Sequence, residues 1–226
     1  SELPVEMNAL KAQQYRWTKG AAECVGKNLP KVFRAKGLSL KTKLHATFHL
    51  MNSSVFVFIL LLSLLAMPVI VIKPELNEYI FLYKLSAFFM LSWFILAAFY
   101  WISHSYGKNE KGKLLVSFLF QFPLFLSISM GLALHNSIAV IEGWMGRKTP
   151  FVRTPKFNVS DKNLWEDNKY NVKKIGVLTY FEAALLIYIL FSFNECINYG
   201  DFGMMPMVAF LIVGYSLSYF YSQKNY

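Results

Sequence analysis

Gln13, Arg16 and Trp17 lie three and four residues apart in the stretch Gln-Gln-Tyr-Arg-Trp near the start of the chain. In a helix, this spacing places their side chains on one face, where we expect them to project into one cleft. The Arg16 guanidinium suits a diphosphate, the Gln13 amide can hydrogen-bond phosphate or hydroxyl groups, and the Trp17 ring offers a flat surface for a sugar. The opposite, apolar side of the helix is expected to consist of Leu10, Ala21 and Cys24.

The same stretch is also compatible with a helix that only lies at a membrane surface. Trp17 would then sit at the depth of the lipid headgroups, and Arg16 and nearby lysines would extend toward lipid phosphates. Taken alone, these five residues favour the membrane-surface interpretation, so the surrounding elements have to be considered.

The composition indicates an integral membrane protein. Hydrophobic residues make up 55% of the sequence, with 21 Phe, and only 16% of residues are charged. Such a chain has too little polar surface for a water-soluble globule. We attribute the net charge of +10 to cytoplasmic orientation and anionic headgroups, because no Gly-rich phosphate loop or base-stacking motif favours nucleic acid. The expected partner is therefore the lipid bilayer and not nucleic acid.

The chain begins at Ser1 without a secretion signal, and its first residues read like the middle of a longer sequence, so we expect a C-terminal fragment. The predicted topology below places Cys24 and Cys196 on opposite sides of the bilayer, and both are expected to be free thiols. No metal site is predicted, because no Cys or carboxylate at ligand spacing accompanies the histidines at positions 45, 49, 104 and 135.

We predict an all-α integral membrane fold. Residues 1–50 should form two amphipathic cytoplasmic interfacial helices, with Pro30 and Gly37 among the breakers. Residues 51–145 should hold two transmembrane helices and a re-entrant or interfacial segment, residues 146–177 a cytoplasmic loop, and residues 178–226 two more transmembrane helices. The apolar stretches that approach the roughly 20 residues needed to cross a bilayer are 55–72, 85–102, 178–198 and 204–221.

Charge placement guides the interpretation of a fifth apolar stretch, 114–145. Cytoplasmic loops collect Lys and Arg. If this stretch enters the membrane and returns, every Lys and Arg except Lys73 and Lys84 lies on the cytoplasmic side, whereas a single crossing divides them almost evenly. We therefore expect a re-entrant or interfacial element that is broken near Pro123 and Gly131. Cysteine labelling at Thr154 from outside intact cells would contradict this topology.

A second motif follows in the basic loop, as Phe151-Val152-Arg153-Thr154-Pro155-Lys156. Taken alone, it is better explained as an ordinary basic juxtamembrane loop with a proline turn at Pro155. Together with Gln-Gln-Tyr-Arg-Trp and the opening Glu-Leu-Pro-Val, in this order, it resembles the processive family 2 glycosyltransferases, the cellulose synthases and more closely the mannan-synthase-like branch. The chain departs from that family at Arg153, where the family usually has Val.

The resemblance implies inverting transfer of a sugar from a UDP- or GDP-linked donor to a growing β-linked polysaccharide. It assigns diphosphate and acceptor binding to Gln13, Arg16 and Trp17, and it assigns a gating role over the nucleotide to Phe151, Thr154 and Lys156. It also implies a carboxylate base and an Asp-x-Asp motif holding Mg²⁺ or Mn²⁺, and the sequence contains no Asp-x-Asp. The base, metal and nucleotide sites are therefore expected upstream, and this fragment alone should be inactive.

Two other classes of protein remain open. The chain could be a transporter or scaffold component with basic lipid-binding surfaces, or a transferase that adds a single sugar to a lipid-linked acceptor. Within the predicted spans, Trp93 is the best candidate for packing against an exported polymer, because it lies mid-span. Glu182 should face the bundle, water or the interface, since a carboxylate is costly in hydrocarbon.

Overall fold

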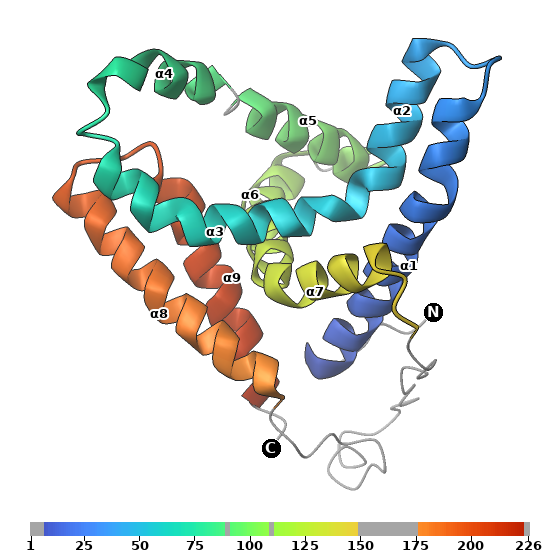
Figure 1. Ribbon diagram of the computed structural model, residues 1–226. Coiled ribbons are helices and arrows are strands. Elements are labelled where there is room, and N and C mark those ends of the chain that lie inside the picture. The colour runs from blue at the N-terminus through green and yellow to red at the C-terminus, as the bar shows by residue number, and fades with distance from the viewer. Residues whose placement is uncertain (1–6, 89–90, 109–110, 149–175, 224–226) are drawn as a thin grey trace, which may run out of the picture. The chain divides into compact units, whose positions relative to one another are not determined.

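The structure is a computed structural model that describes residues 7–88, 91–108, 111–148 and 176–223 (Figure 1). Every regular element in these ranges is helical, which confirms the predicted all-α fold. The α-helices are α1 (Met7–Arg34), α2 (Leu40–Leu50), α3 (Val55–Ile72), α4 (Ile80–Phe88), α5 (Leu91–Ser105), α6 (Lys111–Gly131), α7 (Ala133–Trp144), α8 (Val177–Asn198) and α9 (Met205–Gln223), and the 3-10 helices are η1 (Met51–Ser54) and η2 (Asn77–Tyr79).

Four helical stretches in the described residues are long and apolar enough to cross a bilayer, as a multi-pass membrane protein requires. They are Leu40–Ile72, Gly112–Gly131, Val177–Asn198 and Met205–Gln223. The first runs from α2 through η1 into α3, and the second coincides with nearly all of α6. Three of the predicted spans therefore correspond to α3, α8 and α9.

The fourth predicted span, 85–102, includes residues outside the described ones, so it stays a prediction; its described residues lie in α4 and α5. Helix α6 continues through Pro123 for 21 residues and ends at Gly131. The break expected at Gly131 is present, whereas the break expected at Pro123 is absent. Neighbouring groups can compensate for a proline inside an apolar helix, so its presence does not require the helix to end.

Residues 1–50 contain the two expected helices. Helix α1 continues through Pro30 to Arg34, so this breaker does not end it. Helix α2 begins after Ser39, whose hydroxyl accepts a hydrogen bond from the backbone N–H of Thr42 at 3.2 Å.

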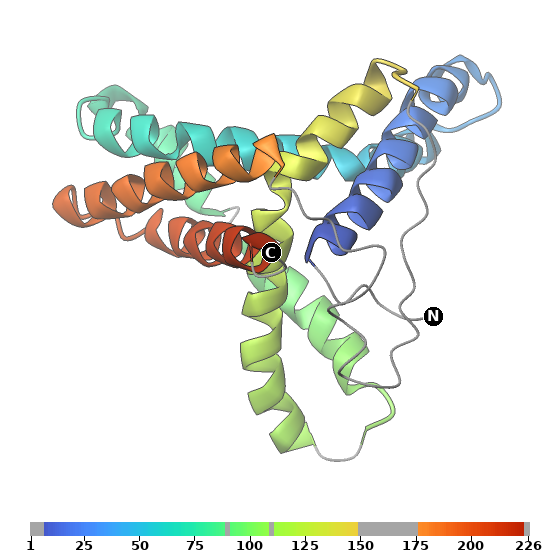
Figure 2. The same cartoon turned by 90° about the horizontal axis from the view of Figure 1, so that it is seen from below.

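The described residues form two compact units. Unit 1 takes its residues from Ser1–Leu62, Leu132–Ala184 and Leu217–Tyr226, and unit 2 from Ser63–Gly131 and Leu185–Ser216. In unit 1, α1 packs along α7, and both helices contact η1. In unit 2, α5 packs against α6, as Figure 2 shows.

Unit 2 is held by aromatic packing and by one unusually close helix contact. Trp93 of α5 stacks on Phe210 of α9, with ring centroids 5.0 Å apart. A Cβ added to Gly131 would lie 2.2 Å from the carbonyl oxygen of Gly214, so the backbones of α6 and α9 touch at these glycines. At another point in the unit, Lys73 Nζ donates a hydrogen bond to Asp201 Oδ2 at 2.8 Å.

Candidate functional site

Helix α1 carries the Gln-Gln-Tyr-Arg-Trp motif and packs through its other side. Thr18, Ala22 and Val25 are buried at the spacing of one helix face. A Cβ added to Gly143 of α7 would lie 2.7 Å from the Cβ of Ala22 and 2.8 Å from the carbonyl oxygen of Lys19, so the two helices approach closely there. The predicted apolar side of α1 was wrong, because Ala21 and Cys24 are exposed.

Gln13, Arg16 and Trp17 lie on the side of α1 that faces away from α7. An α-helix advances by about 100° per residue, which places these three residues roughly opposite Thr18 and Ala22. The Trp17 side chain is 62% exposed, and Gln13 and Arg16 are half-buried. The shared face predicted from the sequence is therefore present in the structure. The predicted gating residues Phe151, Thr154 and Lys156 lie outside the described residues, so their closure over this face stays a prediction.

A buried ion pair fixes the start of α1. Lys11 Nζ donates hydrogen bonds to Glu182 Oε2 of α8 at 2.6 Å and to the Ser222 hydroxyl of α9 at 2.7 Å. The Ser218 hydroxyl of α9 donates to the other carboxylate oxygen of Glu182 at 3.2 Å. Glu182 is 0% exposed, and Lys11 is also buried. Burial lowers the pKa of Lys11, and the negative charge of Glu182 opposes this effect.

A second polar cluster joins α1 to the end of α7. The carboxylate of Glu142 accepts hydrogen bonds from the Tyr15 hydroxyl, from Lys19 Nζ at 3.2 Å and from Arg147 Nη1 at 2.9 Å. The turn that brings Arg147 back to Glu142 depends on Gly146, whose φ of 67° is in the left-handed region, and on the hydrogen bond from the Arg147 N–H to the Glu142 carbonyl at 3.0 Å.

The surroundings of this second cluster change the pKa values of Glu142 and Tyr15. The hydrogen bond from Tyr15 holds the pKa of Glu142 below its ordinary value, and Lys19 acts in the same direction. Burial raises the pKa of Tyr15 to about 12, and the hydrogen bond to Glu142 adds to this increase. Glu142 is therefore a carboxylate and Tyr15 a neutral hydrogen-bond donor at neutral pH.

His135 of α7 lies against the ring of Tyr15 in an edge arrangement, with ring centroids 5.6 Å apart. Burial lowers its pKa to about 4, and the positive charge of Lys11 contributes in the same direction. Among the described residues, His135 Nδ1 and both side-chain polar atoms of the neighbouring Asn136 are buried without a hydrogen-bond partner, as are the hydroxyl oxygens of Ser53 and Ser54 in η1. The α7–η1 contact therefore holds polar groups that ordered water could satisfy.

Acidification should destabilise the folded chain through His135. The unfolded chain takes up a proton near pH 6.5, whereas the folded chain does so near pH 4, so the unfolded state binds more protons between these values. This contribution to stability is present above pH 6.5 and is lost as the pH falls toward 4. The free energy of unfolding should drop by about 2 kcal/mol between pH 7 and pH 5.

Unfolding in mixed detergent micelles at the two pH values measures this difference. The His135→Gln variant serves as the control, because glutamine does not titrate and should show a smaller drop than the parent chain. Equal drops in the parent and in His135→Gln would assign the pH dependence to other groups.

The sequence interpretation missed the residues that hold α1 in place. Lys11, Tyr15 and Lys19 follow one another at four-residue spacing, which places them along the same side of a helix. Glu142 is the acidic residue of a largely apolar helix, and a carboxylate there favours a cationic partner. These two signals together could have paired α1 with α7.

Comparison with models of protein families, with characterised proteins and with solved structures gives no match to this chain.

Proposed function

We propose that this chain is the membrane part of a glycosyltransferase that transfers sugar from a nucleotide sugar to a growing β-linked polysaccharide and exports the product. The resemblance in its two ordered motifs supports this proposal. The structural observation that carries it is the placement of Gln13, Arg16 and Trp17 on the outward side of α1, where the Trp17 ring is 62% exposed. An exposed indole beside a guanidinium suits a sugar linked to a diphosphate.

In this proposal, Arg16 neutralises the leaving diphosphate, Trp17 packs against the acceptor sugar, and Gln13 orients the two groups. The catalytic base and the Mg²⁺ or Mn²⁺ ion are supplied from outside residues 1–226. The loop residues Phe151, Thr154 and Lys156 close over the nucleotide. Purified residues 1–226 should therefore make no polymer, and polymer formation by them alone would contradict this division of roles.

The buried contacts on the other side of α1 support a precise positioning of the motif. Lys11 ties α1 to α8 and α9, and Tyr15 and Lys19 tie it to α7. A binding group held by such supporting contacts loses little conformational freedom when it meets its ligand. The packed side of α1 thus orients the outward side.

Replacing Arg16 by alanine in the intact enzyme should lower turnover about a hundredfold or more, because an electrostatic contact to the departing diphosphate is lost. Polymer formed from a panel of nucleotide sugars by membranes that contain the enzyme measures this effect. Lys27→Ala is the matched control, since Lys27 is an exposed cation on the same helix, and it should retain near-normal turnover. Normal turnover in Arg16→Ala would remove Arg16 from the mechanism.

The same assay separates the other classes of protein. A non-catalytic transporter or scaffold component gives no sugar transfer with any donor. A transferase that adds one sugar to a lipid-linked acceptor gives a product of fixed size, whereas a synthase gives a distribution of polymer lengths.

A further inference from the structure

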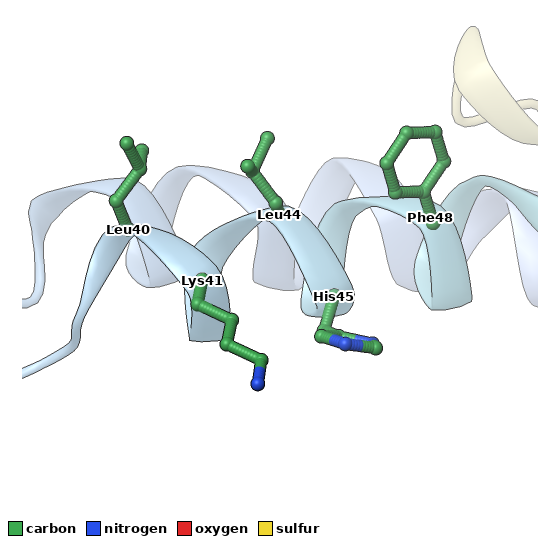
Figure 3. Close-up of a pocket in the computed structure, with 5 residues that line it drawn as sticks. All are labelled: Leu40, Lys41, Leu44, His45 and Phe48. Carbon is green, nitrogen blue, oxygen red and sulfur yellow. The ribbon is translucent and has the colours of Figure 1, made fainter.

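Helix α2 exposes an apolar stripe that no described element covers. Leu40, Leu44 and Phe48 are 72%, 49% and 77% exposed and lie four residues apart. Figure 3 shows their side chains projecting from the same side of the helix, where they line a shallow groove. An exposed stripe of three large apolar side chains at helical spacing is typical of a surface that contacts lipid or another apolar partner.

Nitrogen-bearing side chains border this stripe on α2. Lys41 and His45 also line the groove, and Figure 3 shows their side chains projecting away from the apolar stripe. Lys41 is exposed, as is Lys36 in the turn before α2. Lys43 Nζ donates a hydrogen bond to the Phe33 carbonyl of α1 at 3.0 Å, which fixes α2 against the end of α1.

The sequence around α2 contains no acidic residue. Between Glu23 and Glu75 the chain contains no Asp or Glu, and the cations of this interval that are exposed are Lys27, Lys31, Arg34, Lys36 and Lys41. A surface with cations and no nearby carboxylates attracts anions. Because this basic surface adjoins an apolar stripe, its ligand should combine negative charge with hydrocarbon.

The continuation of α2 shows where such a ligand would be available. Helix α2 runs through η1 into α3, and the combined stretch of 33 residues is longer than the roughly 20 residues that cross a bilayer. Part of it must therefore lie outside the hydrocarbon core, and α2 is the part that carries the charges. We infer that α2 is a docking surface for anionic phospholipid, with Leu40, Leu44 and Phe48 at the acyl chains and Lys36 and Lys41 at the headgroup phosphates.

Lipid selectivity at α2 tests this inference in the full chain, and it does so independently of sugar transfer. Cys24 and Cys196 are replaced by alanine, Leu44→Cys is labelled with a small fluorophore, and the chain is reconstituted in phosphatidylcholine bilayers with 30% phosphatidylglycerol. Quenching of the fluorophore by brominated phosphatidylglycerol is compared with quenching by brominated phosphatidylcholine.

The anionic lipid should be enriched at the label about 25-fold, because Lys36 and Lys41 near the headgroups each contribute about fivefold. Lys36→Gln combined with Lys41→Gln should remove most of this enrichment, and Lys36→Arg combined with Lys41→Arg should restore it. The control is Lys108→Gln, which removes an exposed cation elsewhere and should leave the ratio unchanged. Phe48→Ser should weaken quenching by both lipids without changing their ratio.

Three outcomes would overturn the inference. Equal quenching by the two lipids would make the surface unselective for charge. A fluorophore that is quenched by aqueous iodide and by neither lipid would place α2 in water. A fluorophore that is protected from both iodide and lipids would show that protein, such as a second copy of the chain, covers the stripe.

Discussion

Replacing Glu182 by leucine should lower the free energy of unfolding by about 3–5 kcal/mol. The Lys11 ammonium would then stay buried, and among the described residues the Ser222 hydroxyl would be its remaining hydrogen-bond acceptor. A buried charge without its counter-charge is far more costly than the intact pair, since burial removes the hydration of the ammonium. Unfolding of the purified chain in mixed detergent micelles measures the loss.

Two further variants make this result specific to the ion pair. Combining Glu182→Leu with Lys11→Met should recover a large part of the lost stability, because an apolar pair leaves no charge unpaired. Glu195→Leu removes a carboxylate from the same helix and should cost less than about 1 kcal/mol. In the described part of the chain, Glu195 accepts long hydrogen bonds from Asn194 and Asn198, at 3.5 and 3.3 Å. A double variant no more stable than Glu182→Leu would contradict the proposed role of Lys11.

Gly214→Leu should destabilise the chain by about 3 kcal/mol or more. The first carbon of the new side chain would lie 2.1 Å from the Ser127 carbonyl oxygen and 2.7 Å from the Gly131 nitrogen. Both are backbone atoms of α6, so no side-chain rotation can relieve the overlap and the helices must separate. Thermal unfolding of the detergent-solubilised chain, followed by loss of the monodisperse species, measures the effect.

The matched control for this prediction is Gly112→Leu, the same substitution in α6. A Cβ at Gly112 meets no atom within 4 Å. Leucine has a higher helix propensity than glycine, so this variant should be unchanged or slightly more stable. If Gly214→Leu unfolds at the same temperature as Gly112→Leu, then α6 and α9 do not meet through their backbones.

Much of the fold could be predicted from composition, because long apolar stretches in a chain with few charges have to be helical in a bilayer. The positions of the breaks were harder to predict. Pro30 and Pro123 were expected to break helices, and both lie inside helices. Proline disrupts a helix only if its neighbours leave the freed carbonyl unsatisfied, and a single sequence does not reveal those neighbours.

The candidate site was predictable only on the outward side of α1. The shared face of Gln13, Arg16 and Trp17 follows from helix periodicity alone. The packed side does not, because Lys11 would be assigned to solvent without knowledge of Glu182, which is 171 residues away in the sequence. A buried lysine is compatible with folding only when a carboxylate pairs with it. Whether a carboxylate so distant in the sequence makes that contact is known only from the tertiary structure.

The partners of Lys11 also impose an order on biogenesis. Helix α1 is synthesised before α8 and α9, which supply Glu182 and Ser222. Until these two helices have been made, the Lys11 ammonium lacks both partners and has to stay hydrated. We expect the motif helix to reach its final position only after α8 and α9 have been synthesised. A nascent chain truncated before α9 should therefore leave α1 open to protease.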